Sequence, residues 1–175
     1  MQPDDLQRLR NAIRDIADFP KPGILFKDIT PVLADAGIFR LAIESFASAC
    51  KELGAEKIVG IDARGFIFGA AVAYELGIGF VPVRKKGKLP YETVSQSYLL
   101  EYGEAVVEMH VDAVREDEPV VIVDDLLATG GTAAAATQLL NRAGANVLEA
   151  QFLIELGFLD GRRKLETPVR SFIIY

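Results

Sequence analysis

An apolar run that ends in two neighbouring carboxylates constrains the fold of this chain more than any other feature. The run covers 119–123 and reads PVVIV, and Asp124 and Asp125 follow it directly. A continuous apolar stretch of this length is typical of a strand buried on both faces, as in a parallel sheet between helices. Small residues fill 128–132, and 133–143 has the composition of a helix. We therefore expect a strand, a tight loop and a helix in direct succession.

The same alternation of strand and helix recurs along the chain. Buried strands are predicted over 57–61, 79–83 and 146–154, and helices over 38–53 and 65–76. Strands that are separated by helices form a parallel sheet covered on both faces, and each crossover is expected to be right-handed. The predicted fold class is therefore α/β.

The pattern breaks over 84–111. A basic, glycine-containing stretch leads there into two segments of alternating polarity, 93–100 and 105–111. Alternation of this kind is typical of an antiparallel hairpin. We therefore expect a flexible basic stretch and a hairpin inserted beside the sheet, and a long basic insertion in a compact domain is more often functional than not.

A separate helix is predicted near the N-terminus. Apolar residues recur at helical spacing from Leu6 to Ile16, and Asp4 is expected to cap the first turn. The run FPKPG at 19–23 ends this helix, because neither proline nor glycine continues a helix easily.

Length and charge bound the possible functions. The 175 residues suit one compact α/β domain, expected over 36–175, behind a small N-terminal segment over 1–35. With 19 basic and 25 acidic residues the formal net charge is −6, which argues against sequence-independent binding of nucleic acid. No apolar stretch has the length of a membrane span and the N-terminus does not resemble a signal peptide, so a cytoplasmic protein is expected.

Two single residues are better explained without a functional role. Cys50 has no second cysteine to pair with and is expected as a small apolar residue on a buried helix face, with a reactive thiol as the alternative. His110 lies in a strand-like stretch without a cluster of His, Cys or carboxylates around it. Neither metal ligation nor a general-base role is expected for it.

The stretch from Asp124 to Thr132 carries the clearest chemistry. In open α/β sheets, ligands bind beyond the carboxyl ends of the strands. Gly130 and Gly131 let backbone N–H groups approach an anion, and the next helix directs its positive end there. A carboxylate pair beside a phosphate cradle suits a ribose, whose hydroxyls donate to the carboxylates, and it suits Mg²⁺. The alternative is that the carboxylates only cap local backbone and the glycines only form a turn.

Two acidic residues followed by Thr-Gly-Gly-Thr resemble the signature with which type I phosphoribosyltransferases bind phosphoribosyl pyrophosphate (PRPP). The resemblance implies the fold of that family, a parallel sheet flanked by helices with an N-terminal hood and an inserted antiparallel hairpin and mobile loop. It implies that Asp124 and Asp125 hold the ribose hydroxyls, with no direct protein ligand assigned to Mg²⁺. It assigns the 5′-phosphate to Ala128, Thr129, Gly130, Gly131 and Thr132.

The run FPKPGILFKDITP at 19–31 resembles the base-binding hood of the adenine phosphoribosyltransferases. The resemblance implies that Phe26 stacks on adenine and that main-chain groups of Leu25 and Lys27 read its edge. Leu159 matches the residue on the other face of the base, and the family often has Arg where Lys27 stands. Without the resemblance, Phe26 would be interpreted as core and Leu159 as a core residue at a helix start.

Two further segments resemble phosphate-binding parts of that family. Asp62, Ala63 and Arg64, between a strand and a helix, resemble its pyrophosphate loop, where Arg offers a two-pronged donor to phosphate. Arg84 and Lys88 lie at the start of the expected mobile loop. In the family the counterpart of Arg84 reaches the pyrophosphate of the neighbouring subunit, so the resemblance implies a homodimer. Without it, Arg64 is a surface residue after a turn and the basic run a solvated loop.

Glu101, in the run LEYG at 100–103, matches the acid/base residue of the family, whereas as a bare sequence feature it is an exposed, inert hairpin residue. The resemblance implies transfer of the phosphoribosyl group from PRPP to adenine, giving AMP and pyrophosphate, with Mg²⁺ as cofactor. One alternative is a different base, against which the hood residues argue. Another is a regulator that binds PRPP as an effector, for which an acidic chain of this length leaves little room for a DNA-binding domain.

Overall fold

The structure, a computed structural model, describes residues 3–99 and 103–175. It divides the chain into two compact units, with the boundary between Ser45 and Phe46. Helix α3 (Ala36–Leu53) runs through that boundary. The division at 35/36 expected from the sequence stays a prediction.

The first unit consists of short elements, and its helix is shorter than predicted. They are α1 (Pro3–Ala12), β1 (Arg14–Ala17), β2 (Leu25–Asp28), α2 (Thr30–Ala34) and the first part of α3. The predicted continuation of the first helix to Ile16 is wrong, because 14–17 pair antiparallel with 25–28 and Ile16 lies opposite Phe26. The predicted cap Asp4 lies inside the first turn of α1.

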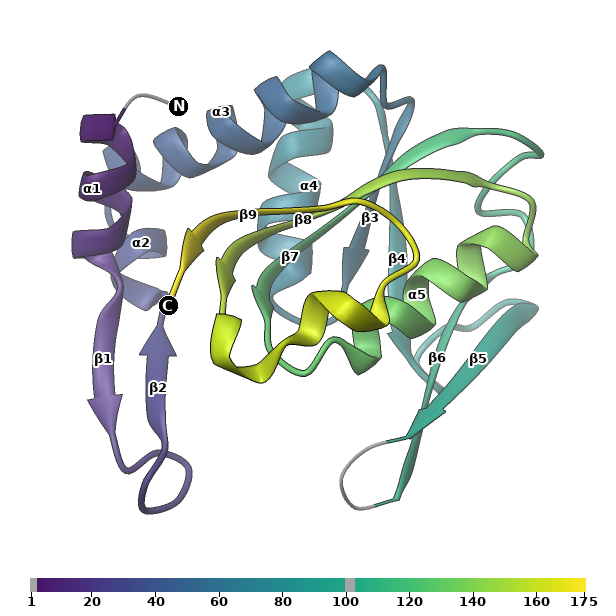
Figure 1. The fold of residues 1–175 in the computed structure, drawn as a ribbon. Helices are drawn as coiled ribbons and strands as arrows, with labels where there is room; N and C mark the ends of the chain where they lie inside the picture. The colour runs from purple at the N-terminus through teal and green to yellow at the C-terminus, as the bar shows by residue number, and fades with distance from the viewer. Residues whose placement is uncertain (1–2, 100–102) are drawn as a thin grey trace. The chain divides into compact units, whose positions relative to one another are not determined.

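The second unit contains a sheet of seven strands over the described residues (Figure 1). Their order is β5-β6-β4-β3-β7-β8-β9. The elements are β3 (Lys57–Ile61), α4 (Gly65–Leu76), β4 (Gly79–Lys85), β5 (Thr93–Leu99), β6 (Glu104–His110), β7 (Pro119–Leu127), α5 (Gly131–Arg142), β8 (Asn146–Glu155), η1 (Gly157–Leu159), η2 (Gly161–Lys164) and β9 (Val169–Ile174).

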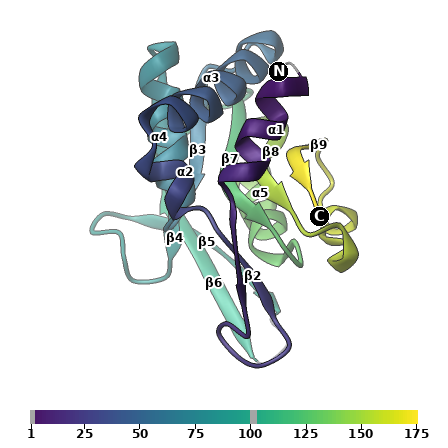
Figure 2. The ribbon, with the colours of Figure 1, turned by 90° about the vertical axis from the view of Figure 1, so that its left-hand side faces the viewer.

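The sheet is parallel in its centre and antiparallel at one edge. Strands β4, β3, β7, β8 and β9 pair in parallel, whereas β6 pairs antiparallel with both β4 and β5. The β5–β6 hairpin extends beyond the ends of the parallel strands (Figure 2). The predicted α/β class and the inserted hairpin are therefore confirmed, and β9 is a strand that the sequence patterns had not indicated.

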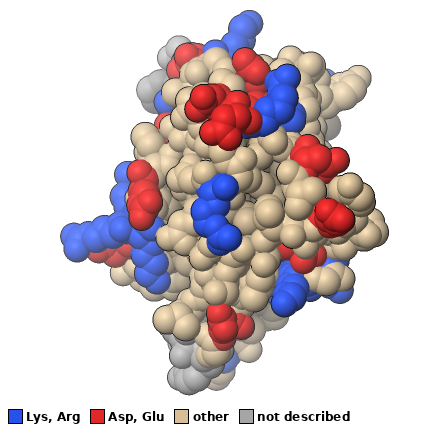
Figure 3. Space-filling model, turned by 90° about the vertical axis from the view of Figure 1, so that its right-hand side faces the viewer, with Lys and Arg blue, Asp and Glu red and all other residues tan. Residues whose placement is uncertain are grey.

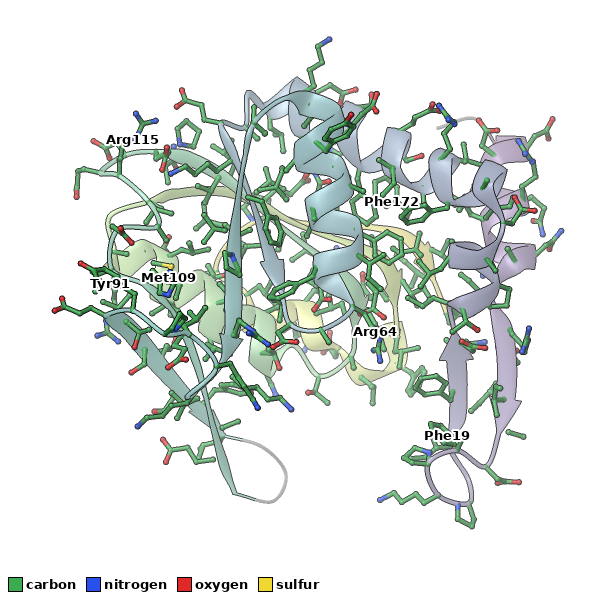
Figure 4. The ribbon with its side chains drawn as sticks, turned by 180° about the vertical axis from the view of Figure 1, so that it is seen from behind. Phe19, Arg64, Tyr91, Met109, Arg115 and Phe172 are labelled. Atoms are coloured by element: carbon green, nitrogen blue, oxygen red, sulfur yellow. The ribbon has the colours of Figure 1, made fainter. Side chains whose placement is uncertain are left out.

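Helices cover both faces of this sheet, as the front view of Figure 1 and the rear view of Figure 4 show for α5 and α4. The central strands are buried between them, and Val59, Val121 and Ile122 are 0% exposed. Strand β7 continues to Leu127, beyond the predicted run, because its partner β8 pairs with it as far as Glu155. The two carboxylates therefore lie within the end of the strand.

Cys50 and His110 each contact another side chain of the second unit. Cys50 is fully buried, and its thiol donates to the side-chain amide oxygen Oε1 of Gln151 at 3.4 Å. Burial raises the pKa of this thiol to about 12, which agrees with the buried, unreactive interpretation. His110 packs edge-on against Tyr91, with ring centroids 5.9 Å apart.

Among the described helices, none combines the length and apolar character that crossing a membrane requires.

Candidate functional site

A cavity of about 300 Å³ opens at the carboxyl ends of β3 and β7. One wall is the turn between β3 and α4, residues 61–64. The other wall is 124–133, which comprises the end of β7, the following loop and the first turn of α5. Two groups that the sequence predicted separately, Asp62 to Arg64 and Asp124 to Thr132, thus line one space at the edge where such sheets bind ligands.

Close backbone packing shapes the loop over 128–132. Gly130 has a φ of +77°, and a Cβ there would lie 2.2 Å from the carbonyl oxygen of Gly161. A Cβ on Gly161 would in turn lie 2.1 Å from the carbonyl oxygen of Ala128. Only glycine on both sides permits this approach. The loop therefore packs against the start of η2. Helix α5 begins at the cavity, so its first N–H groups lie there.

The carboxylate pair and Arg64 form one charged cluster on the cavity wall. Oδ1 of Asp124 accepts the N–H of Asp125 at 2.8 Å. Asp125 is 4% exposed, and its carboxylate accepts a hydrogen bond from Nε of Arg64. Arg64 lies at the N-terminal end of α4 (Figure 4) and so bridges the ends of the two strands. Gly65 makes room for the pair, since a Cβ there would lie 2.7 Å from Oδ1 of Asp124.

Burial and charge shift the pKa values of this cluster in a direction that suits a ligand. Burial, and then the negative charge of Asp125, raise the pKa of Asp124 well above its ordinary value. Burial lowers the pKa of Arg64, but the charge and hydrogen bond of Asp125 outweigh burial and leave the net pKa raised. An ionised Asp124 is therefore short of compensating donors or positive charge, which ribose hydroxyls or a cation would supply.

The basic stretch over 84–90 reaches the same turn through Arg84. Nε of Arg84 donates to Oδ2 of Asp62 at 2.9 Å, and its Nη1 donates to the carbonyl oxygen of Lys88 at 3.0 Å. Its guanidinium carbon also lies 5.9 Å from the ring centroid of Phe66. Arg84 and Lys88 are thus brought together with Asp62, although neither is part of the cavity lining.

Comparison with known proteins identifies the family. The sequence profile of the phosphoribosyl transferase domain matches residues 33–171. Adenine phosphoribosyltransferase of Neorhizobium galegae is 56% identical over 158 residues, which are 90% of this chain and 87% of that protein. The chain belongs to the adenine phosphoribosyltransferase family. It is accordingly an enzyme of phosphoribosyl transfer, and the alternatives of a different base and of a PRPP-sensing regulator find no support.

Solved structures of adenine phosphoribosyltransferases have the same fold. The enzyme of Rhodothermus marinus has a TM-score of 0.93 and 50% identity, covering 99% of this chain and 100% of that one. The enzyme of Saccharomyces cerevisiae has a TM-score of 0.93 and 43% identity, covering 97% and 98% of the two chains. It was crystallised with adenine and an imino-altritol bisphosphate. The predicted type I phosphoribosyltransferase fold is therefore confirmed.

The adenine-binding candidates are divided between the two units. In the first unit, Phe26 is half-buried and packs edge-on against Phe19 of the β1–β2 loop (Figure 4), with ring centroids 5.1 Å apart. Leu25 is 51% exposed, and Nζ of Lys27 lies 2.6 Å from Oδ1 of Asp15. Leu25 and Phe26 are thus not fully buried, and the role of the three residues in binding adenine stays a prediction.

Leu159 and Glu101 are the remaining candidates for the binding of adenine and for acid/base chemistry. Leu159 lies in η1 of the second unit and is 39% exposed, so its interpretation as a core residue at a helix start is wrong. It is exposed because η1 is a single turn after β8 and presents no buried face. Glu101 lies outside the described residues.

Two residues that contact the loop over 128–132 were missed by sequence reasoning. Gly161 lies against the loop, and only its position in the run LDGRR could have drawn attention to a turn there. Oη of Tyr98, on β5, lies 3.1 Å from Oγ1 of Thr132. No local signal in the sequence indicates this contact, because it depends on how the hairpin packs against α5.

Proposed function

We propose that this chain transfers the phosphoribosyl group of PRPP to adenine at the cavity beside β3 and β7, and releases AMP and pyrophosphate. One observation carries the proposal. In a chain of this family, a single cavity is lined by a glycine phosphate loop, a carboxylate pair and Arg64. These three features match the three parts of PRPP, namely its 5′-phosphate, its ribose and its pyrophosphate.

The 5′-phosphate is proposed to bind Ala128, Thr129, Gly130, Gly131 and Thr132. Backbone N–H groups at the start of α5 have no partner within the helix, and the helix dipole favours an anion there. The hydroxyls of Thr129 and Thr132 add donors. Since the tight glycine packing fixes the loop before any ligand arrives, little conformational entropy is lost on binding.

The ribose is proposed to donate its hydroxyls to Asp124 and Asp125. Such donors stabilise the ionised form of Asp124, whose pKa is raised in the ligand-free protein. As the bond from the anomeric carbon to pyrophosphate breaks, positive charge develops on the sugar ring. The nearby carboxylates favour that charge, so the same pair serves both binding and the transition state.

Magnesium fits this site as an ion that enters with PRPP. The described residues contain no group of three or more His, Cys, Asp or Glu that could hold a metal. Mg²⁺ commonly binds through one or two carboxylates together with substrate phosphates and water, so Asp124 and Asp125 suffice as protein partners, directly or through water. When bound, Mg²⁺ would neutralise charge that develops on pyrophosphate.

The pyrophosphate is proposed to contact Asp62, Ala63, Arg64, Arg84 and Lys88. The backbone N–H groups of Ala63 and Arg64 and the guanidinium of Arg64 are the proposed donors in the cavity wall, because the N–H of Asp62 is already donated to the carbonyl oxygen of Val83. Arg84 and Lys88 add positive charge from the basic stretch. Charge that accumulates on the leaving group would be stabilised by these donors in the transition state.

Adenine is proposed to be recognised by Leu25, Phe26 and Lys27 of the hood and by Leu159. The exposed apolar surface of Leu25 and the Phe26 ring suit a flat heterocycle. Glu101 is proposed to hold or share the proton of the imidazole ring of adenine while the new bond to the sugar forms. The salt bridge of Lys27 to Asp15 engages its side chain, which favours recognition of the base edge by main-chain groups.

A homodimer is proposed because α4 has apolar side chains on its solvent side. Its sequence, GFIFGAAVAYEL, is apolar almost all round, which is typical of a helix with buried surroundings. Yet Ile67 is 41% exposed and Tyr74 is 88% exposed. A second copy of this chain would cover them. On the face drawn in Figure 3, by contrast, acidic and basic side chains are interspersed. Location in the cytoplasm stays a prediction.

The test is formation of pyrophosphate and of the corresponding nucleoside monophosphate from PRPP in the presence of Mg²⁺, with adenine, hypoxanthine, guanine or uracil offered singly. Turnover with adenine alone is the expected result. Turnover with another base and not with adenine would overturn the role of the hood residues while leaving the PRPP site in place. Binding of PRPP without any turnover would contradict the proposed activity.

A further inference from the structure

Glu108 is a buried carboxylate that accepts hydrogen bonds from the backbone of the basic stretch over 84–90. It lies on β6 and is 4% exposed. Its Oε1 accepts the N–H of Lys88 at 3.0 Å and the N–H of Leu89 at 3.1 Å. One oxygen of this side chain therefore fixes two successive backbone groups at the residue proposed to bind pyrophosphate.

Arg84 binds the carbonyl group of the same residue, Lys88. Arg84 and Glu108 are direct neighbours across the antiparallel pairing of β4 with β6. Nη1 of Arg84 donates to the carbonyl oxygen of Lys88, while its Nε donates to Asp62 in the cavity wall. Both backbone polar groups of Lys88 are thus engaged, and a continuous series of contacts runs from Glu108 through Lys88 and Arg84 to Asp62.

The charge of Glu108 is directed at the backbone of the stretch. Burial raises the pKa of its carboxyl, but the N–H groups of Gly87, Lys88 and Leu89, with the charge of Lys86, outweigh burial and lower the net pKa. The carboxylate is therefore ionised at neutral pH. Charge-assisted hydrogen bonds to backbone N–H groups are stronger than neutral ones, so the turn is held firmly.

We propose that Glu108 is a positioning residue for pyrophosphate binding, which orders the 86–89 turn and thereby fixes Lys88 and the guanidinium of Arg84 that is bonded to it. This inference rests on the proposed function of the cavity. Glu108 does not line the cavity, and its Oε1 is used by the turn. Its effect on the reaction passes through the two cations.

Glu118 provides a matched control. It is also a buried glutamate, 3% exposed, and it also accepts a backbone N–H, that of Arg115 at 3.0 Å, together with Nζ of Lys57 at 2.9 Å. Its carboxyl likewise has a lowered net pKa, although burial alone would raise it. Glu118 precedes the first residue of β7, at the end of the strand opposite to the cavity.

The experiment compares Glu108→Ala, Glu108→Gln and Glu118→Ala with the unmodified enzyme in steady-state assays and in thermal unfolding. Glu108→Ala is expected to raise the KM for PRPP about tenfold, which corresponds to ~1.4 kcal/mol, and to leave the KM for adenine within about twofold. Glu108→Gln retains an acceptor oxygen and should give an intermediate KM for PRPP. Glu118→Ala should lower the melting temperature without changing either KM.

The outcomes separate this inference from the proposed function. If the unmodified enzyme forms no AMP from adenine, the proposed function itself fails. If that enzyme is active but Glu108→Ala leaves the KM for PRPP unchanged, the positioning role is wrong. It is also wrong if Glu108→Ala raises both KM values alike or resembles Glu118→Ala, because a general loss of structure then explains the effect.

Discussion

The loop over 128–132 and the basic stretch over 84–90, called here the phosphate loop and the basic segment, are both proposed to bind phosphate groups of one substrate, yet they are constructed in opposite ways. The phosphate loop presents backbone N–H groups and rests on Gly161. The basic segment presents charged side chains, and its backbone is held by hydrogen bonds that it donates to Glu108 and accepts from Arg84. The first site is formed by steric fit and the second by electrostatics.

The difference shows how each region should respond to change. Where backbone atoms already approach to van der Waals contact, adding a single methyl group disrupts the binding geometry. Where hydrogen bonds hold a backbone with no atoms packed closely against it, added volume matters little and lost charge matters more. Two glycines with similar backbone angles, one in each region, make this contrast testable.

The largest effect is expected for Gly130→Ala in the phosphate loop. A Cβ at this position would lie 2.2 Å from the carbonyl oxygen of Gly161, and the φ of +77° adds strain of its own. The loop must move, so its N–H groups no longer converge on one phosphate. We expect kcat/KM for PRPP to fall at least about 100-fold, equivalent to ~2.7 kcal/mol of lost transition-state stabilisation. A fall of less than threefold would contradict the close packing inferred for this loop.

An intermediate effect is expected for Asp124→Asn, which keeps an acceptor for the N–H of Asp125 but removes the charge. We expect kcat/KM to fall about tenfold or more, equivalent to ~1.4 kcal/mol. Stability should change in the opposite sense, because the raised pKa of Asp124 means that ionisation of this carboxyl opposes folding.

The pH dependence of unfolding checks the sign of that effect. The folded protein keeps the Asp124 proton to higher pH than the unfolded chain, so it loses stability as pH rises from the ordinary value towards the raised pKa. Thermal unfolding should show Asp124→Asn above the unmodified protein at neutral pH, with the difference vanishing below about pH 4. A melting difference that is constant across this range would argue against a raised pKa.

The smallest effect is expected for Gly87→Ala in the basic segment. Its φ of +81° is close to that of Gly130, but no atom lies within 4 Å of a Cβ built there. Only the strain of the left-handed conformation remains, roughly 1–2 kcal/mol, and an exposed turn can relax part of it. We expect the KM for PRPP to stay within about threefold, a far smaller change than for Gly130→Ala. Equal losses in the two variants would show that strain alone, and not contact with Gly161, governs Gly130.

The two regions also differ in how far the sequence could predict them. The strand at 57–61 and the helix at 65–76 agree with the residue bounds predicted, because apolar periodicity and flanking glycines are local signals. The phosphate loop has such signals too, in its acidic pair and its glycines. The basic segment has only charge, and a run of lysines is equally typical of a solvated loop.

The features that the sequence did not predict depend on contacts between residues far apart in the chain. The first helix ends at Ala12 because 14–17 pair with a strand eleven positions further along the chain, which helical spacing alone does not reveal. Gly161, Tyr98 and Glu108 all act on segments more than eighteen residues away. The pattern of one sequence gives no signal for such pairs. The family resemblance predicts the candidate ligand-binding residues but not the residues that hold them.

The most direct test of the account is a pair of calorimetric titrations, with ribose 5-phosphate and with magnesium pyrophosphate, on Thr129→Ala and Lys88→Ala. The two-region account predicts a crossed result. Thr129→Ala should weaken ribose 5-phosphate about tenfold and leave pyrophosphate within about twofold, and Lys88→Ala should do the reverse, each tenfold step being ~1.4 kcal/mol. If either variant weakens both ligands equally, the two regions do not bind separate ends of PRPP, and the assignment is wrong.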